Sequence, residues 1–238
     1  MSGTDRKARI RQEVWDRLVA AGAARFPFPP HGRIPNFAGA AEAAARLFEL
    51  PLIARAKRIK VNPDAPQRAV RIEALRRGIR VYVPTPRLRG GFLELDPSRI
   101  PRSSQREACS LAGMSRWAQP VELSAFRTPD ALVVGSVAVS LAGQRCGKGE
   151  GYADLEYGAL RELGHPPVPV VTTVHATQIV TGIPGAPTDL PLAWIVTPAR
   201  TLRVRRPPPA PSGIDWSCVG EAELDAMPLL RELRDRSG

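Results

Sequence analysis

Residues 131–164 read ALVVGSVAVSLAGQRCGKGEGYADLEYGALRELG, and this stretch decides the fold class. Its first ten residues form a continuous apolar run of the kind that is buried on both faces of a parallel sheet. A glycine-rich loop follows, and residues 152–163 then place apolar side chains at helical spacing before Gly164. VPVVTTVH at 168–175 predicts the next strand. The stretch therefore predicts a strand–helix–strand unit with a right-handed crossover.

Strand-like and helical patterns also alternate on both sides of this unit. Alternation at this spacing indicates an α/β fold with a mostly parallel sheet. Asn36 is predicted to cap a helix that Pro51 ends. The remaining patterns predict helices at 5–21, 66–77 and 220–235, and strands at 55–62, 79–84, 90–95 and 192–198.

Length and composition indicate one main domain, because 238 residues with 43% hydrophobic content can bury a sizeable core. We expect a single α/β domain over 1–206, followed over 207–238 by a proline-rich linker and a short C-terminal helix. That helix could pack on the body or extend away from it. No apolar run approaches the ~18–20 residues that span a bilayer, so we expect no membrane partner. The charged N-terminus and three scattered cysteines indicate a reduced, cytoplasmic protein.

Positive charge is concentrated in the first half of the chain. Residues 1–130 hold 24 Lys and Arg against 12 Asp and Glu, whereas residues 131–238 hold 10 against 11. Such an asymmetry points to an anionic partner: phosphates, a polycarboxylate or nucleic acid. A general bias toward arginine explains the total charge equally well.

The loop from Gly143 to Asp154 is the strongest candidate for an anion site. Glycines allow backbone N–H groups to approach a ligand, and the N-terminus of the following helix attracts negative charge. Arg145 and Lys148 add two full positive charges. The loop departs from the Walker pattern, because Gly149 stands where a magnesium-binding hydroxyl is needed. It departs from the dinucleotide fingerprint too, because no third glycine follows at the required spacing.

A third pattern does fit, because residues 145–154 follow R-x-G-x-G-x-G-Y-x-D. This resembles the signature of the 5-formyltetrahydrofolate cyclo-ligase family. KARIR at 7–11, VYVPTPRLRGGFLEL at 81–95 and DLPLAWIVT at 189–197 agree with the family in order. HGRIPNFAGA at 31–40 is similar to the divergent branch of methenyltetrahydrofolate synthetase domain-containing proteins. Ala153 and Leu155 depart from the family, which has Tyr and Arg at these two positions.

The resemblance implies a fold, a reaction and a set of site residues. The fold is a three-layer, Rossmann-like, CoA-transferase-like α/β structure, and the substrates are ATP and a reduced folate, with or without a polyglutamate tail. Mg²⁺ would assist the conversion of 5-formyltetrahydrofolate to 5,10-methenyltetrahydrofolate. The implied catalytic residues are Arg145, Lys148 and Tyr152. The implied ATP-binding residues are Lys7, Arg11, Gly143, Arg145, Gly147, Lys148, Gly149, Gly151 and Tyr152. Asp154 and Glu150 would hold the metal, and Tyr82, Arg87, Phe92 and Trp117 would line the folate pocket.

Two other functions are compatible with the same sequence. The first is an enzyme or binding protein of the same fold that acts on another folate-like or phosphorylated substrate. The second is a basic RNA-binding or regulatory module. The absence of a recognised RNA-binding motif argues against a nucleic-acid partner. No pattern in the sequence sets an oligomeric state.

Overall fold

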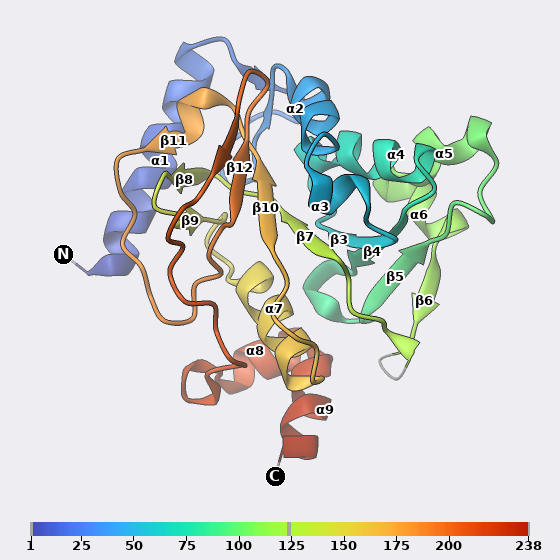
Figure 1. The fold of residues 1–238 in the computed structure, drawn as a ribbon. Coiled ribbons are helices and arrows are strands. Elements are labelled where there is room, and N and C mark those ends of the chain that lie inside the picture. The colour runs from blue at the N-terminus through green and yellow to red at the C-terminus, as the bar shows by residue number, and fades with distance from the viewer. Residues whose placement is uncertain (1, 123–124, 238) are drawn as a thin grey trace.

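An eight-stranded sheet runs through the centre of the computed structural model, which describes residues 2–122 and 125–237 (Figure 1). Its order is β13-β12-β10-β7-β3-β4-β5-β6. The five strands β12, β10, β7, β3 and β4 are mutually parallel. At the two ends of the sheet, β13 is antiparallel to β12, β5 to β4, and β6 to β5. The predicted mostly parallel sheet is therefore confirmed. The strands are β3 (Arg58–Val61), β4 (Arg80–Pro84), β5 (Phe92–Leu95), β6 (Gln119–Val121), β7 (Ala131–Val134), β10 (Val170–Thr173), β12 (Trp194–Val196) and β13 (Thr201–Arg203).

Helices cover both faces of this sheet, which gives the predicted three layers (Figure 1). Strand β7 shows the reason, because all four of its side chains are buried. Ala131 and Val133 join the core beneath one helical layer, and Leu132 and Val134 join the core beneath the other. The first layer holds α2 (Ala40–Leu47), α3 (Pro51–Ala54), α4 (Arg68–Arg76), α5 (Gln105–Ala108) and α6 (Leu111–Trp117). The second holds α7 (Tyr152–Glu162), α8 (Glu221–Ala226) and α9 (Pro228–Ser237).

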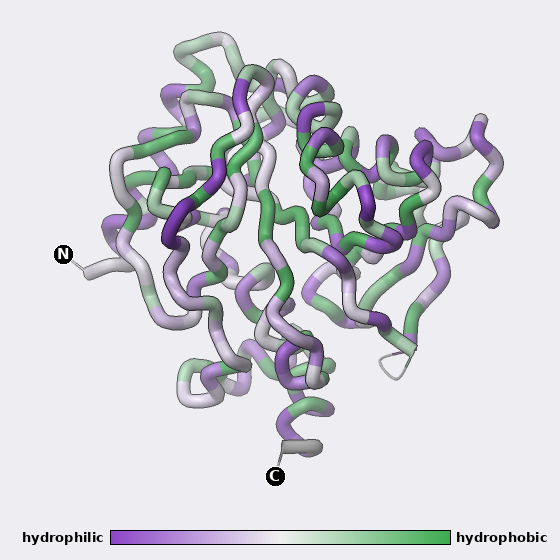
Figure 2. The backbone as a smooth tube through the Cα atoms, viewed as in Figure 1, coloured by the Kyte–Doolittle hydropathy of each residue, from purple (hydrophilic) through white to green (hydrophobic). Residues whose placement is uncertain are grey.

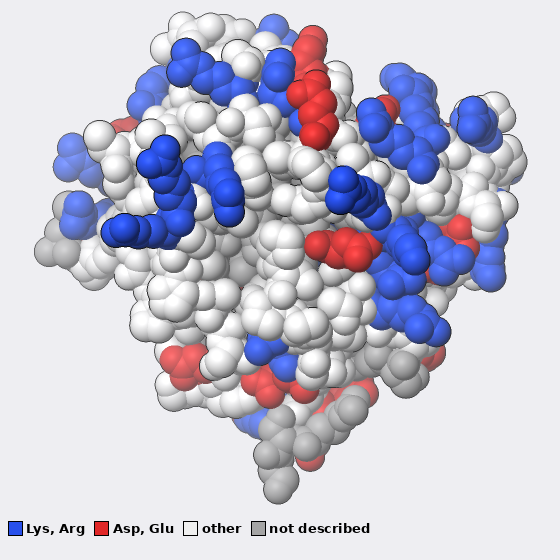
Figure 3. All heavy atoms as spheres, in the orientation of Figure 1, with Lys and Arg blue, Asp and Glu red and all other residues white. Residues whose placement is uncertain are grey.

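The surface pattern follows from this layering. Figure 2 shows hydrophobic residues concentrated along the central strands and hydrophilic residues in the outer turns. In Figure 3, Lys and Arg lie in groups toward the edges of the visible face, and its centre carries few charged side chains.

The N-terminal helix α1 (Gly3–Ala20) packs beside the sheet as a separate element (Figure 1). The Ser2 hydroxyl accepts from the Asp5 N–H and the Asp5 carboxylate accepts from the Ser2 N–H, which together form a capping box. Val14 and Leu18 are fully buried, and they pack in a third core cluster with Val137 and Ala138. The helix predicted at 5–21 is confirmed.

The apolar run at 131–140 is two strands rather than one. Strand β7 ends at Val134, and β8 (Ala138–Ser140) belongs to a separate three-stranded sheet with β9 (Arg145–Cys146) and β11 (Ile179–Val180). Gly135 allows the change of sheet. A Cβ there would lie 2.8 Å from an Asp64 carboxylate oxygen and 2.8 Å from an Ile34 methyl carbon.

The predicted roles of Asn36 and Pro51 are wrong. Asn36 lies in β2 (Asn36–Phe37), which pairs with β1 (Ala24–Arg25), and its side-chain amide donates to the Phe26 carbonyl. Gly39, with φ 85°, is the N-cap of α2 instead. Helix α2 has already ended when Pro51 begins α3, where its missing N–H costs nothing.

The C-terminal segment packs on the body of the protein. Leu224, Met227, Leu230 and Leu233 are buried in the same core cluster as Tyr157 of α7. The single helix predicted at 220–235 is two helices, because Pro228 starts α9 and cannot continue α8.

None of the helices in the described part of the chain is both long enough and apolar enough to cross a bilayer.

Candidate functional site

The candidate site lies where parallel strands β3, β7 and β10 end at one edge of the sheet. Polar bonds fix the segments that follow them. The Thr172 hydroxyl of β10 donates to the Val134 carbonyl at 2.7 Å, and the Ser136 hydroxyl lies 3.0 Å from the Thr172 hydroxyl. Gln178 donates to the carbonyls of Ser136 and Val137. These bonds position the β8–β9 hairpin and the loop that leads from it into α7.

The loop 147–151 presents a row of backbone N–H groups. Within the described residues, none of the N–H groups of residues 147–152 donates a hydrogen bond to the protein. Gly149 has φ 114° and Gly151 has φ 70°, conformations that favour glycine. Unpaired N–H groups at the start of the 11-residue helix α7 attract an anion.

Arg145 and Asp154 form a tight ion pair behind this loop. The Arg145 Nη2 lies 2.6 Å from the Asp154 Oδ1, which also accepts from the Leu190 N–H at 2.9 Å. The arginine side chain is 3% exposed and the aspartate side chain 25%. Gly147 makes room for the pair, because a Cβ there would lie 3.2 Å from the Arg145 Nη1. The predicted metal ligand and the predicted phosphate ligand are therefore in direct contact.

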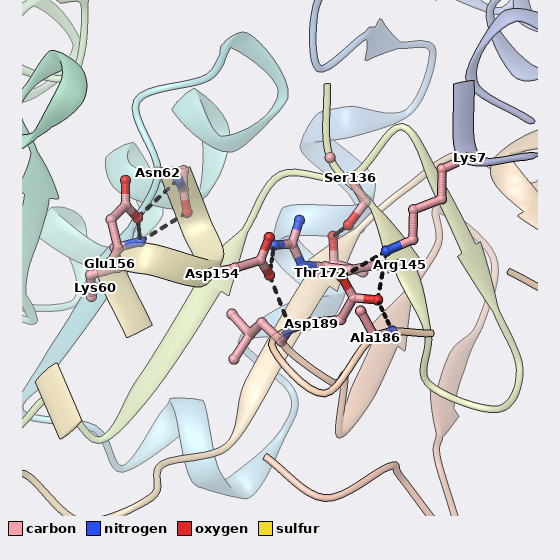
Figure 4. A network of polar contacts seen from close by, with 12 residues as sticks. Lys7, Lys60, Asn62, Ser136, Arg145, Asp154, Glu156, Thr172, Ala186 and Asp189 are labelled. Atoms are coloured by element: carbon pink, nitrogen blue, oxygen red, sulfur yellow. Dashed lines mark hydrogen bonds and ion pairs between the residues drawn. The ribbon is translucent and has the colours of Figure 1, made fainter. Parts of the chain in front are cut away.

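Helix α1 brings two further cations to the loop. The Lys7 Nζ lies 2.6 and 2.7 Å from the two carboxylate oxygens of Asp189 (Figure 4). The Arg11 Nε donates to the Gly147 carbonyl at 2.8 Å, and its guanidinium lies against Gly149. Lys7 and Arg11 are four residues apart on one helix, so both reach the same loop. Figure 4 shows the Arg145–Asp154 pair and the Lys7–Asp189 pair next to each other.

The other predicted loop residues have more varied surroundings. Lys148 and Glu150 pair with each other at 2.7 Å, with side chains 38% and 44% exposed. Tyr152 begins α7 and packs against the core beneath that helix. Gly143 lies apart, at the β8–β9 turn with φ 87°, where a Cβ would lie 2.8 Å from the Leu192 carbonyl oxygen. This close approach of the Leu192 carbonyl explains why residue 143 is a glycine.

The predicted folate-pocket residues do not gather at one place. Tyr82 and Phe92 are buried on either side of Phe126, with ring centroids 4.4 and 4.6 Å from its centroid. Trp117 packs against the core on the opposite face of the sheet. Arg87 is exposed in the turn after β4, at the same edge of the sheet as the loop.

A second polar cluster lies under α7 and was not anticipated from the sequence. Lys60 of β3 is fully buried and forms an ion pair with Glu156 of α7, whose side chain is 5% exposed (Figure 4). The Lys60 Nζ also donates to the Asn62 Oδ1 at 3.1 Å, and the Asn62 amide lies 3.4 Å from the Glu156 carboxylate. Glu156 points inward to a lysine that interrupts the apolar pattern of β3.

Asp64 lies in the segment after β3, two residues beyond Asn62 and at the same edge of the sheet. Burial raises the pKa of its carboxyl group, and the nearby charge of Glu156 raises it further. Arg71, which is 1% exposed, donates to the carbonyls of Asn62, Pro63 and Asp64 and so fixes the segment. Burial lowers the pKa of Arg71 to about 10.

Sequence reasoning missed Asp189, Lys60 and Glu156 as site residues. The sequence does offer a signal for Asp189, because this residue opens the DLPLAWIVT segment that agrees with the family pattern. The signal for Lys60 is weaker: it is a charged residue between Ile59 and Val61 in a predicted buried strand. Glu156 gave none, because its inward orientation depends on how α7 is rotated against the sheet.

Comparisons with known proteins show which family the chain resembles. The family model described as the 5-formyltetrahydrofolate cyclo-ligase family matches residues 4–198. A methenyltetrahydrofolate synthase domain-containing protein from Mus musculus is 44% identical over 237 residues, and its counterpart from Homo sapiens is 38% identical over 237 residues. Each match covers 97% of this chain, and the chain spans 63% and 62% of those two relatives.

A solved structure supports the fold. The 5,10-methenyltetrahydrofolate synthetase from Aquifex aeolicus superposes with a TM-score of 0.54 at 19% identity, covering 84% of this chain and 93% of the other. At this identity the likeness establishes a shared fold.

Proposed function

Because this chain belongs to the 5-formyltetrahydrofolate cyclo-ligase family, we propose that it converts 5-formyltetrahydrofolate to 5,10-methenyltetrahydrofolate with ATP and Mg²⁺. Its curated relatives carry the name of the methenyltetrahydrofolate synthase domain, which supports a synthetase-like activity. The observation that carries the proposal is the loop 147–151, whose unpaired N–H groups face a site flanked by Lys7, Arg11 and Arg145. We further propose that the reaction takes place in the cytoplasm.

The ATP triphosphate would lie along the glycine loop. Backbone N–H groups of residues 147–151 would donate to its oxygens, as they do in other anion sites at helix N-termini. Lys7 and Arg145 would exchange their carboxylate partners for phosphate, with Arg11 and Lys148 on either side. Tyr152 would contact the nucleotide or the folate from the first turn of α7. Phosphoryl transfer depends chiefly on positioning and on neutralising charge, which this set of residues supplies.

The carboxylates of the site fit a magnesium ion. Mg²⁺ prefers oxygen ligands and usually takes one or two protein carboxylates together with phosphates and water. Asp154 and Asp189 are each about a quarter exposed, and Asp154 bonds the backbone next to Asp189, so the two carboxylates lie close together. In the described residues no group of three or more His, Cys, Asp or Glu side chains is arranged to hold a metal ion. Glu150 pairs with Lys148 and its side chain is 44% exposed. Asp154 and Asp189 are less exposed and lie beside each other, so they are the better pair.

In the proposed reaction the formyl oxygen attacks the γ-phosphorus and the bond to the bridging β–γ oxygen breaks, releasing ADP. N10 then attacks the formyl carbon and loses its proton, and the carbon–oxygen bond breaks to release phosphate. Bound Mg²⁺ would neutralise charge on the triphosphate. Arg145, Lys148 and the loop N–H groups would stabilise the charge on the transferred group. Arg87, at the same edge of the sheet, would meet the carboxylates of the folate.

A second candidate is an enzyme of this fold with another folate-like or phosphorylated substrate. It is favoured by Ala153 and Leu155, which replace the family's Tyr and Arg, and by the Lys60–Glu156 pair that occupies the space beneath α7. This candidate shares ATP binding with the first one. It differs in the product formed.

The test is to mix the purified chain with MgATP and 5-formyltetrahydrofolate and to follow the near-ultraviolet absorbance of the methenyl product. We expect product, and we expect Asp189→Asn to lower kcat/KM by at least about tenfold, because a contact made to a charged group is lost. Asp235→Asn, an exposed carboxylate of α9, is the matched control and should leave the rate unchanged. ATP binding without product would favour the second candidate, and absence of both would refute both.

A further inference from the structure

A cavity of about 390 Å³ lies on the side of the protein away from the glycine loop. It is formed by the end of α4, the start of β4, the end of β5 and the first turn of α5, and its polar lining includes Arg76, Arg80, Asp96, Arg102 and Gln105. Strand β4 is parallel to β3. The start of β4 therefore lies at the sheet edge opposite to the one where β3 ends and the candidate site begins.

The charge of this cavity is positive. Three arginines line it against one carboxylate, and Figure 3 shows Lys and Arg gathered on the side of the molecule where α4 and α5 lie. Asp96 is already bound, because Arg80 lies 3.1 Å from one of its oxygens and the Ser98 hydroxyl donates to the other at 2.7 Å. Burial opposes its ionisation, but the Ser98 hydrogen bonds, Arg80 and Arg99 outweigh burial and lower the pKa of Asp96.

The other two arginines are free to bind a ligand. The Arg102 guanidinium makes no hydrogen bond or ion pair within the described residues, and the Arg76 guanidinium has only a 3.9 Å contact with Glu73. Asp96 thus neutralises Arg80, and the cavity keeps an excess of two guanidinium groups. A guanidinium presents a planar fork of donors that matches the oxygens of a phosphate or carboxylate.

Gln105 provides a second, independent sign of a ligand. It lines the cavity, it is only 4% exposed, and its Oε1 is buried without a partner. Its side-chain amide makes no hydrogen bond to any residue in the described ranges. Buried side-chain polar groups are nearly always hydrogen-bonded in native proteins, and leaving one unpaired is costly. The Gln105 amide thus has unused hydrogen-bonding capacity at the wall of the cavity, where a ligand can supply a partner.

We propose that this cavity binds a small phosphorylated molecule. Its phosphate group is held by Arg76 and Arg102, and a hydroxyl of the same molecule bonds the Gln105 amide. A phosphate monoester carries close to two negative charges at neutral pH and three acceptor oxygens, which match the guanidinium groups of Arg76 and Arg102. The volume lies in the range of small-molecule sites. Because the cavity and the glycine loop occupy opposite sheet edges, this site is separate from the one proposed for ATP.

The test is a titration of the ¹⁵N-labelled chain with glycerol 3-phosphate, followed by the amide resonances of Gly78 and Ser98 at the cavity and of Gly149 at the loop. Glycerol and glutarate are the comparison probes, the first without charge and the second a dicarboxylate. We expect saturable shifts at Gly78 and Ser98 with glycerol 3-phosphate, no shift with glycerol and weaker binding of glutarate.

Two variants that each remove one arginine test whether the cavity is the binding site for glycerol 3-phosphate. Arg102→Gln should weaken binding at Gly78 and Ser98 by about tenfold or more, the loss expected when a charge-assisted hydrogen bond is removed. Arg106→Gln removes an exposed arginine of the same segment that does not line the cavity, and it should leave binding within twofold. Shifts confined to Gly149, equal weakening by both variants, or tighter binding of glutarate would each overturn the proposal.

Discussion

Two sets of ion pairs lie on either side of the first turn of α7, and they differ in burial. The closed pair, Lys60 with Glu156, has side chains 0% and 5% exposed. The exchangeable pairs, Lys7 with Asp189 and Arg145 with Asp154, each include a carboxylate that is 25% exposed. Asp154 and Glu156, two positions apart on α7, therefore form ion pairs in two different environments.

This difference separates a positioning role from a binding role. Removing one partner of a buried pair leaves an unpaired charge, which costs several kcal/mol, so the closed pair holds α7 against β3 and does not open. In the exchangeable pairs the carboxylate is partly open to solvent, and a phosphate that takes its place keeps the cation paired. The exchangeable pairs can therefore release Lys7 and Arg145 to a phosphate ligand while α7 stays in place.

The largest expected effect comes from breaking the closed pair. Glu156→Ala should lower the free energy of unfolding by about 3–5 kcal/mol, because Lys60 would remain charged and buried. Urea denaturation with a two-state fit measures this loss.

A double variant is the control for that experiment. Lys60→Met combined with Glu156→Leu removes both charges and should recover most of the lost stability, since apolar replacement of a buried pair is often neutral. A loss below about 1 kcal/mol in the single variant, or a double variant as unstable as the single one, would show that the pair does not hold α7.

The next largest effect concerns an exchangeable pair. Lys7→Ala should weaken MgATP binding by about 10- to 100-fold, because a charge-assisted hydrogen bond to phosphate is lost. Its stability should change by less than about 1 kcal/mol. Titration calorimetry measures the first quantity and urea denaturation the second. Arg9→Ala, an exposed cation on the same helix, should change neither. Equal affinities for the Lys7 and Arg9 variants would remove Lys7 from the site.

The smallest effect is a pH dependence at Asp64. Burial and the charge of Glu156 raise the pKa of Asp64 in the folded state, so the folded protein holds this proton more tightly than the unfolded chain does. Stability is therefore lost as the pH rises through the folded pKa. Asp64→Asn should be more stable than the parent protein at pH 7, and the difference should shrink as the pH falls. A constant difference across pH, measured by urea denaturation, would contradict this assignment.

The sequence predicted the layers and most elements because apolar periodicity is a local property. The helix at 152–163 and the strands around 58–61, 80–84 and 170–173 follow from it. The prediction fails where a contact between distant parts of the chain determines the secondary structure. Asn36 pairs with Arg25 in a two-stranded sheet instead of capping α2, and β8 leaves the main sheet to pair with β9. The local sequence pattern does not reveal which strand each of these segments pairs with.

The candidate site shows the same division. The glycine spacing and the cations Arg145 and Lys148 were predicted from one continuous segment. The contact between Arg145 and Asp154 and the approach of Lys7 to Asp189, which is 182 positions along the chain, depend on how α1 and the 186–190 segment pack around the loop. The family resemblance implies Tyr82 and Phe92 as pocket walls, and the structure places both in the core around Phe126.

The central claim is that the glycine loop binds a triphosphate through its backbone. Its most direct test is a crystal structure of the chain with Mg²⁺ and an ATP analogue that cannot be hydrolysed between the β- and γ-phosphates. We predict phosphate oxygens about 3 Å from the N–H groups of residues 147–151, with the Lys7 ammonium moved from Asp189 to phosphate. A nucleotide bound elsewhere, with the Lys7–Asp189 and Arg145–Asp154 pairs unchanged, would contradict the account.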